Sequence, residues 1–212
     1  MTELYNRLAD APVVPLVQAN DPDVAVAITE ALAAGGLTVI EVVLRTPAAM
    51  QCLAAIAKAL PDVIVGAGTV LSSDQARQAL DSGSKFIVSP GFDEGVHAVS
   101  SDAGVPLLPG VMTPTELQRA SNLGLETVKF FPASIAGGVP ALKALSSVFG
   151  HMKFMPTGGV SAANLAEYLS VPAVVACGGS WLTPADAIEA GHYEIITRLA
   201  SEAVTVASVV RS

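Results

Sequence analysis

The sequence contains few charged, aromatic and cysteine residues, and these shortages exclude several classes of protein. Charged residues make up 14% of the 212 residues and hydrophobic residues 51%, which is too much apolar surface for an intrinsically disordered chain. Lys and Arg number 11 and Asp and Glu number 19, so the net charge is −8. Because a phosphate backbone would repel such a chain, nucleic acid is not an expected partner.

Long uninterrupted hydrophobic runs are also missing. A membrane-spanning helix needs about 20 consecutive apolar residues. Each apolar run here is cut well before that length, by charged residues such as Glu30, Glu41 and Arg45 or by Gly and Pro. The first residues include Glu3 and Arg7 and lack the basic and then apolar pattern of a secretory signal. We therefore expect no membrane association and a cytoplasmic location.

Cysteine and histidine are too sparse and too scattered to indicate a metal centre. Cys52 and Cys177 show neither a C-x-x-C motif nor any metal-type spacing. His97, His151 and His192 fall in or beside predicted helices, and not at the ends of predicted strands. The sequence therefore predicts no metal ligands and two reduced thiols in the core.

Short runs rich in β-branched residues alternate with helical patterns along the chain. We predict eight strands from these runs, at residues 13–17, 38–44, 63–65, 86–88, 106–108, 127–130, 153–155 and 173–176. Eight strand–helix units in 212 residues lie near the lower size limit of a (β/α)₈ barrel. We predict an α/β fold, with residues 1–212 forming a single (β/α)₈ TIM barrel domain with an N-terminal helix.

A doubly wound open sheet is the rival fold. Such a sheet normally carries a glycine-rich nucleotide-binding turn after its first strand, whereas this chain has Gln18-Ala19-Asn20-Asp21 there. The absence of glycine from that turn favours the barrel.

Several helix starts are marked by a capping residue followed by proline. The pairs that we interpret in this way are Asp21-Pro22, Thr46-Pro47, Thr113-Pro114 and Thr183-Pro184. Glu116 lies three residues after Thr113, which is the spacing of a capping box.

Two predicted strands each direct a charged residue toward the barrel interior. Alternate strand residues share a face, so Glu41 of strand 38–44 points inward and Arg45 lies at the C-terminal mouth. Strand 127–130 directs Lys129 inward in the same way. A lysine amine that is held neutral is a nucleophile for carbonyl carbon, and a buried carboxylate is costly unless it is paired or functional. The pattern leaves two interpretations open, a catalytic pair and an inert buried ion pair.

Glycines cluster after the last two predicted strands. Gly158-Gly159 follows the seventh strand, and Gly178-Gly179-Ser180 follows the eighth. Phosphate sites in barrels are often built from these two loops, where backbone N–H groups and a helix N-terminus meet the anion. Either pair alone is typical of a tight turn, but the two at matching positions favour a phosphate site.

Six motifs between residues 13 and 198 form a recognisable set. They are Glu41 with Leu44-Arg45-Thr46, Gly66-Ala67-Gly68-Thr69-Val70, Ser89-Pro90-Gly91, Val128-Lys129-Phe130-Phe131-Pro132-Ala133, Pro156-Thr157-Gly158-Gly159 and Gly178-Gly179-Ser180-Trp181-Leu182. In this order they resemble the class I 2-keto-3-deoxy-6-phosphogluconate (KDPG) aldolases, a family that includes 4-hydroxy-2-oxoglutarate (KHG) aldolase.

The resemblance implies a carbon–carbon lyase that reversibly cleaves KDPG to pyruvate and D-glyceraldehyde 3-phosphate, with KHG as a second substrate that yields pyruvate and glyoxylate. It implies that Lys129 forms a Schiff base with the 2-keto acid and that Glu41 transfers protons, so neither a metal nor a separate cofactor is expected. It also implies a homo-oligomer, namely a trimer. The substrate-binding residues it implies are Arg45 and Thr69 for the carboxylate, Pro90 and Phe131 around the pyruvyl carbons, Thr157, and Gly158, Gly159, Gly179 and Ser180 for the phosphate.

The chain departs from the family pattern at one position. Many members have Glu after Phe-Pro-Ala, where this chain has Ser134, so substrate preference or pH profile is expected to differ. Three other functions stay open: a 2-keto-3-deoxy-6-phosphogalactonate aldolase, a phosphate-binding barrel isomerase or epimerase without imine chemistry, and a non-catalytic sugar-phosphate binding protein.

Overall fold

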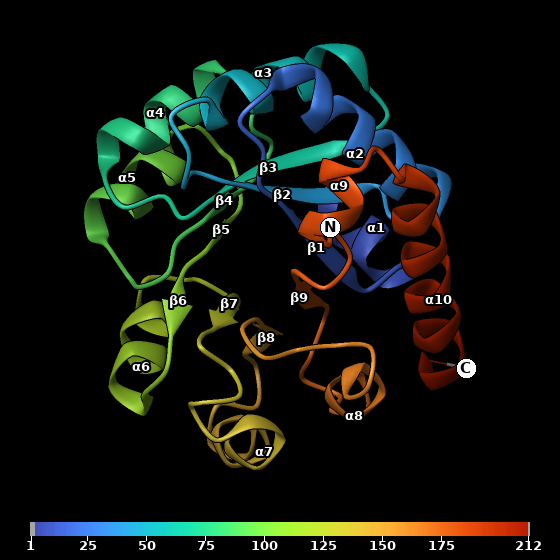
Figure 1. The fold of residues 1–212 in the computed structure, drawn as a ribbon. Helices are drawn as coiled ribbons and strands as arrows, with labels where there is room; N and C mark the ends of the chain where they lie inside the picture. The colour runs from blue at the N-terminus through green and yellow to red at the C-terminus, as the bar shows by residue number, and fades with distance from the viewer. Residues whose placement is uncertain (1–2, 212) are drawn as a thin grey trace.

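The protein is built from a curled parallel sheet that is surrounded by helices (Figure 1). The computed structural model describes residues 3–211. In chain order its elements are α1 (Glu3–Asp10), β1 (Val13–Val17), α2 (Pro22–Ala34), β2 (Val39–Val43), α3 (Ala49–Ala59), β3 (Ile64–Gly68), α4 (Ser73–Asp81), β4 (Ile87–Val88), α5 (Glu94–Asp102), β5 (Leu107–Leu108), β6 (Gly110–Val111), α6 (Pro114–Asn122), β7 (Thr127–Phe130), α7 (Gly138–Val148), β8 (Lys153–Pro156), α8 (Leu165–Leu169), β9 (Cys177–Gly179), α9 (Ala185–Glu189) and α10 (Tyr193–Arg211).

The strands form two hydrogen-bonded sections. One section has the order β5-β4-β3-β2-β1-β9, and the other has the order β6-β7-β8. Pro109 separates β5 from β6 because it has no N–H to donate, although its carbonyl still accepts a hydrogen bond from the Lys129 backbone N at 2.9 Å. Two isolated parallel bridges, Phe154 with Val174 and Thr157 with Gly178, connect the β8 side to the β9 side.

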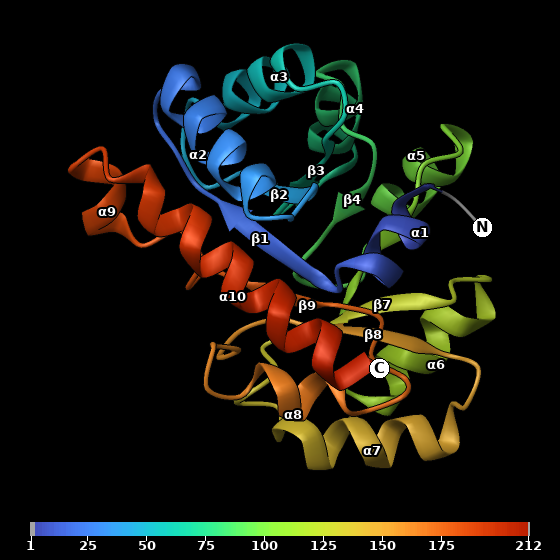
Figure 2. The ribbon, with the colours of Figure 1, turned by 90° about the vertical axis from the view of Figure 1, so that its right-hand side faces the viewer.

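The alternation of residues along the strands separates two cores. Ile40 and Val42 of β2 belong to the large core between the sheet and the helices (Figure 2), whereas Val39 belongs to a smaller core on the concave side. Leu4 and Leu8 of α1 belong to this inner core as well. The inward and outward faces predicted for β2 therefore agree with the structure.

Helix α1 lies at the amino ends of the strands. Arg7 Nη1 donates to Thr38 Oγ1 just before β2, at 3.3 Å. Tyr5 lines a hollow together with Thr127, the first residue of β7, and Leu107, the first residue of β5. Because Leu4 and Leu8 are only 4% and 2% exposed, this helix covers the amino end of the inner core.

Two of the four predicted helix caps are confirmed. Asp21 Oδ1 accepts from the backbone N of Asp23 at the start of α2, and Thr113 and Glu116 form a reciprocal capping box at the start of α6.

The other two predicted caps are wrong. Helix α3 begins at Ala49 and α9 at Ala185, and neither start has a side-chain cap. The Thr46 hydroxyl instead donates to the Ala19 carbonyl at 2.8 Å, and the Thr183 hydroxyl donates to the Leu16 carbonyl at 2.9 Å. Both threonines therefore fasten a loop to β1 or to the residues that follow it.

The last predicted strand is also displaced. Residues 173–176 contain only the isolated bridge at Val174, and the strand itself is Cys177–Gly179. Two glycines are poor strand formers, but Gly178 and Gly179 pair with Val14 and Pro15 of β1. The neighbouring edge of β1 therefore sets the position of this strand, against local propensity.

Candidate active site

Glu41 and Lys129 meet on the concave side of the sheet. Lys129 Nζ donates to Glu41 Oε1 at 3.2 Å, and their side chains are 5% and 0% exposed. The two residues come from β2 and β7, which belong to different sections of the sheet. Val128 and Phe130, which flank Lys129 in β7, pack in the large core between the sheet and the helices, which we call the outer core. The alternation along the strand therefore directs Lys129 inward.

The second oxygen of the Glu41 carboxylate has no partner. Among residues 3–211, Glu41 Oε2 is the buried side-chain oxygen or nitrogen without a hydrogen bond. Removing a carboxylate from water is costly, and leaving a buried acceptor unsatisfied adds to that cost. A buried ion pair that serves stability alone needs additional hydrogen bonds to offset its desolvation, and Oε2 has none. The arrangement therefore favours a group that exchanges hydrogen-bond partners or protons.

Phe131 borders the lysine. Lys129 Nζ lies 5.3 Å from the centroid of the Phe131 ring, within the range of a cation–π contact. Phe131 is half-buried and follows β7 directly, so its ring stands at the carboxyl end of the strand beside the amine. The structure thus brings together the predicted nucleophile and a residue predicted to shape its surroundings.

Arg45 and Thr69 also meet at the carboxyl end. Arg45 Nε donates to Thr69 Oγ1 at 3.4 Å, between the loops that follow β2 and β3. Thr69 has φ of 61° and is the non-glycine residue with positive φ among residues 3–211. For a β-branched residue this conformation costs about 1–3 kcal/mol and is concentrated at functional sites. Hydrogen bonds from Leu44 N to Gly68 O and from Val70 N to Val88 O hold the backbone on both sides.

Pro90 is placed by a tight contact with β6. The Ser89 hydroxyl donates to the Gly91 carbonyl at 2.7 Å and closes the turn around Pro90. Gly110 packs directly on this turn, since a Cβ there would lie 2.0 Å from the Pro90 carbonyl oxygen. The sequence analysis did not identify Gly110 as a residue that shapes the site.

The two glycine clusters lie side by side, one in the loop after β8 and the other within β9. Thr157 is 3% exposed and forms a bridge with Gly178, so the start of the loop after β8 contacts strand β9 itself, in which the structure places Gly178 and Gly179. Gly158 and Gly159 have φ of 91° and 80°, which a residue with a side chain adopts only under strain. Gly179 leaves room for the Trp181 ring, which a Cβ would meet at 1.8 Å.

Ser134 contacts the first of these loops. Its backbone N donates to the Gly158 carbonyl at 3.0 Å. A Cβ on Gly159 would lie 2.1 Å from Ser134 Oγ, so the serine side chain occupies the space that this glycine leaves. The position where the sequence departs from the family pattern therefore adjoins the predicted phosphate loop.

A small hollow connects the two predicted substrate-binding regions. It has a volume of about 260 Å³ and includes both Arg45 and Ser180 in its wall. Gln18, Val43 and Thr183 also line it. The sequence analysis did not assign these three residues to the site, although Gln18 directly follows β1 and could have been found from that position.

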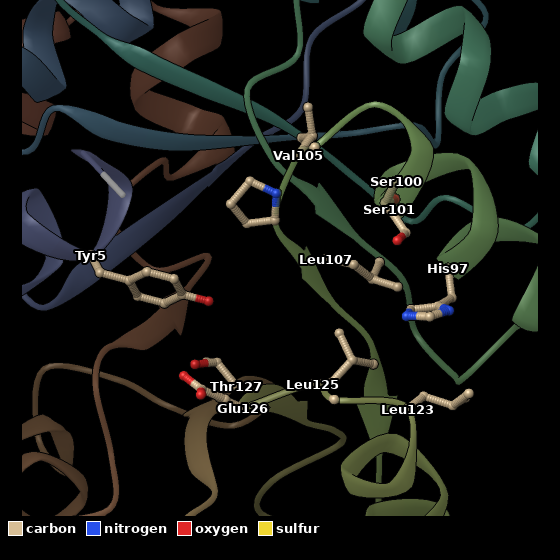
Figure 3. A pocket seen from close by; sticks show the side chains of 13 residues that line it. Tyr5, His97, Ser100, Ser101, Val105, Leu107, Leu123, Leu125, Glu126 and Thr127 are labelled. Atoms are coloured by element: carbon tan, nitrogen blue, oxygen red, sulfur yellow. The ribbon is translucent and has the colours of Figure 1, made fainter. Parts of the chain in front are cut away.

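Two larger hollows lie at the opposite end of the strands. One of about 370 Å³ is lined by Tyr5, His97 and Thr127 among others (Figure 3), and one of about 510 Å³ includes Lys153 and Arg211. Glu41 and Lys129 line neither of these hollows, nor the smaller one that includes Arg45 and Ser180. Burial raises the pKa of Tyr5, so its phenol stays neutral at physiological pH.

In the described part of the chain, the cysteines and the potential metal ligands form no second reactive cluster. Cys52 and Cys177 are free and buried, and burial raises the pKa of Cys177 to about 12, which keeps its thiol protonated. Within residues 3–211, no group of three or more His, Cys, Asp or Glu side chains is arranged to hold a metal ion. In the same range, no helix combines the length and apolar character needed to cross a membrane.

Comparison with known proteins assigns the chain to a family. The family described as KDPG and KHG aldolase matches residues 4–199. The chain belongs to this aldolase family. The KHG/KDPG aldolase of Escherichia coli K12 is 46% identical over 203 residues, which cover 96% of this chain and 95% of the relative. The resemblance stated from the motifs is thus confirmed.

Two solved aldolase structures share the fold. A KDPG aldolase from Legionella pneumophila, with pyruvate captured at low pH as a covalent carbinolamine intermediate, superposes with a TM-score of 0.90 at 40% identity and covers 94% of this chain and 97% of its own. The 2-keto-3-deoxy-6-phosphogluconate aldolase of Zymomonas mobilis ZM4 with 3-phosphoglycerate superposes with a TM-score of 0.87 at 41% identity. The match covers 95% of this chain and 94% of the Zymomonas chain. Both agree with the curled parallel sheet described above.

Proposed function

We propose that this protein is a class I aldolase that cleaves KDPG to pyruvate and D-glyceraldehyde 3-phosphate through an imine on Lys129. The observation that carries the proposal is the buried contact between Lys129 Nζ and Glu41 Oε1 at 3.2 Å, with Glu41 Oε2 unpartnered. The Legionella relative supports the same chemistry, because pyruvate is captured in it as a covalent carbinolamine intermediate.

The pair can carry every proton transfer of the reaction. In our proposal the Lys129 ammonium gives a proton to Glu41, and the neutral amine attacks the C2 carbonyl to form a carbinolamine. Glu41 returns a proton to the departing hydroxyl, which leaves as water, and a protonated imine remains. The carboxylate then takes the proton of the C4 hydroxyl, directly or through one water, as the C3–C4 bond breaks.

The products leave in order. The electrons of the broken bond pass into the imine and form an enamine, while the aldehyde departs. Glu41 returns its proton to C3, and water hydrolyses the resulting protonated imine, which releases pyruvate and restores the Lys129 ammonium and the Glu41 carboxylate. Phe131, 5.3 Å from the nitrogen, stabilises the positive charge of the imine. These reaction steps require neither a metal ion nor a separate cofactor.

The substrate would span the hollow between the two loop regions. Arg45 and Thr69 would bind the carboxylate, because a guanidinium fork and a hydroxyl match its two oxygens. Pro90 and Phe131 would border the pyruvyl carbons. Gly158, Gly159, Gly179 and Ser180 would bind the phosphate, and Thr157 would support them from beneath. Gly158 and Gly159 have left-handed backbone conformations, which occur in loops whose N–H groups bind anions.

The proposal extends to architecture. We treat residues 107–111 as one strand interrupted at Pro109, which makes the sheet an eight-stranded (β/α)₈ barrel in a single domain over residues 1–212. We further propose a homotrimer, in line with the family. Equilibrium sedimentation of the purified chain tests the trimer, and a monomer or dimer mass would contradict it.

Cleavage of KHG is the second candidate activity. The Escherichia coli relative carries both activities in its name, and an unphosphorylated substrate needs only the carboxylate end of the site. Comparing kcat/KM for KDPG, its galactonate epimer and KHG decides among the three substrates.

Trapping the imine tests the central proposal. The protein is incubated with pyruvate and sodium borohydride, with and without EDTA, and digested for peptide mass spectrometry. We expect a reduced pyruvyl adduct on Lys129 that EDTA does not affect. An active protein with no adduct, or with an adduct on Lys85, Lys143 or Lys153 instead, would favour a proton-transfer isomerase or epimerase, and an inactive protein without an adduct would favour a binding protein.

A further inference from the structure

The Glu41 carboxylate lies against a residue that has no side chain. Gly68 ends β3 and pairs in register with Val43 on β2, two residues beyond Glu41. A Cβ built on Gly68 would lie 2.1 Å from Glu41 Oε1 and 2.6 Å from both Cγ and Cδ of the same side chain. Cβ atoms do not approach other heavy atoms closer than about 3.0 Å in real proteins.

The conformation of Gly68 does not require glycine. Its φ lies outside the positive range, in contrast to Gly158 and Gly159. Val65 and Ala67 of the same strand face the outer core, so alternation directs position 68 to the concave side. The need for glycine at this position is therefore a need for space on the side where the carboxylate lies.

The β3 backbone is held more firmly than the Glu41 side chain that lies against it. Oε1 contacts Lys129 Nζ at 3.2 Å, and the Glu41 side chain is fully buried. The backbone of β3 is held by its register with β2 and by the hydrogen bond from Leu44 N to Gly68 O at 2.8 Å. If a methyl group were added at position 68, the flexible end of Glu41 would be displaced before the strand is.

We propose that Gly68 is a positioning residue, and that the space it leaves sets the place of the Glu41 carboxylate relative to Lys129. The proposal rests on the aldolase function proposed above. A general base must lie within hydrogen-bond reach of the proton it takes, and small displacements are costly for catalysis. An alanine at position 68 would move the base without removing it.

Kinetics of Gly68→Ala give the first test. We expect kcat for KDPG cleavage to fall about 10- to 1,000-fold, KM to change much less, and the pH profile of kcat to shift. Glu41→Asp withdraws the carboxylate from the added methyl, so the double variant Glu41→Asp with Gly68→Ala should be no slower than Glu41→Asp alone. Independent losses that multiply in the double variant would overturn the proposal, as would wild-type kinetics of Gly68→Ala.

A thermal unfolding cycle tests the contact without any activity. Gly68→Ala should lower the midpoint of unfolding of the otherwise wild-type chain by much more than it lowers that of a Glu41→Ala chain, in which the displaced side chain is gone. Gly66→Ala is the control on the same strand, since the three heavy atoms nearest to a Cβ there, at 2.4–2.5 Å, all belong to the Phe86 ring. The loss in unfolding midpoint caused by Gly66→Ala should therefore be the same with and without Glu41→Ala.

The two tests separate the inference from the proposed function. A loss from Gly68→Ala that is equally large with and without Glu41→Ala contradicts the contact, and if Gly68→Ala alone fails to fold, failure of the double variant where Glu41→Ala alone folds contradicts it as well. The loss in unfolding midpoint from Gly68→Ala could be smaller in the Glu41→Ala chain while the wild-type protein cleaves no KDPG. That result would contradict the aldolase function and would leave Gly68 with the structural role of making space for the Glu41 carboxylate.

Discussion

The larger hollows lie at the amino end of the curled sheet, whereas the residues that we assign to catalysis do not line them. The amino end has hollows of about 370 and 510 Å³, both bordered by Tyr5, whereas the hollow at the carboxyl end measures about 260 Å³. The larger hollows are bordered by exposed charges, Glu126, Lys153 and Arg211. Arg45, which lines the smaller one, donates to the strained Thr69, and the buried ion pair lies on the concave side of the same sheet.

The two ends differ because the charged groups at the amino end are hydrated, whereas Glu41 and Lys129 are buried. Exposed carboxylates and amines keep their hydration, so they behave as ordinary surface groups. Glu41 and Lys129 have lost nearly all of theirs, and only function or a complete set of hydrogen bonds explains that cost. Buried, incompletely satisfied charge therefore identifies the reactive end better than volume does.

Replacing one lysine at each end should give the largest contrast. Lys129→Ala should abolish cleavage of KDPG and the borohydride adduct, because no other amine borders Glu41 in the described hydrogen-bond network. Lys153→Ala, at the amino-end hollow, should leave kcat unchanged. The measurement is steady-state cleavage with pyruvate detected by a coupled assay, and circular dichroism verifies folding. Near-normal cleavage by Lys129→Ala would refute the nucleophile assignment.

Two glutamates provide the next comparison. Glu41→Gln should lower kcat by about 10²- to 10⁴-fold, the usual contribution of general acid–base catalysis. Glu126→Gln should have no effect, because this exposed side chain borders only the amino-end hollows. Single-turnover kinetics at several pH values measure both. Equal losses in the two variants would mean that the ends of the sheet share the chemistry.

The amino end should matter for stability. Leu8→Ala deletes a side chain that is 2% exposed in the inner core, and we expect the free energy of unfolding to fall by about 2–5 kcal/mol. The kcat of the folded enzyme should not change. Urea titration gives the stability, and activity below the transition gives kcat. A loss of kcat without a loss of stability would place part of the mechanism at this end.

The smallest expected effect compares two exposed serines. Ser180→Ala should raise KM for KDPG several-fold and leave KHG unaffected, because KHG has no phosphate to bind. Ser101→Ala, which borders the hollow in Figure 3, should change neither. Initial-rate kinetics with both substrates provide the measurement. Equal changes in KM for KDPG and KHG would contradict a phosphate role for Ser180.

Much of the site follows from strand alternation in the sequence. The period of two directs Glu41 and Lys129 inward, and parallel strands bring Arg45 and Thr69 to one edge. The left-handed backbone of Thr69 and the space beside Gly68 could not be predicted, because they depend on neighbouring strands and not on local pattern. The roles of these residues stay predictions.

The errors in the fold have the same origin. Thr46 and Thr183 have the sequence of helix caps, yet each finds a carbonyl acceptor contributed by a distant segment. Residues 173–176 have higher strand propensity than the glycines that replace them in β9, but those glycines face β1. Local sequence gave the wrong answer where a long-range partner competed for the same group.

The pairing of β1 with β9 has a consequence for biosynthesis. Val13 pairs with Cys177, so one edge of the first strand stays open until most of the chain has been made. Contacts between such distant segments form late, because they carry the largest loop-closure cost. During translation the growing chain therefore exposes a strand edge of Val13–Val17, and a ribosome-bound nascent chain that ends before Cys177 presents that edge to chaperones or to a neighbouring chain.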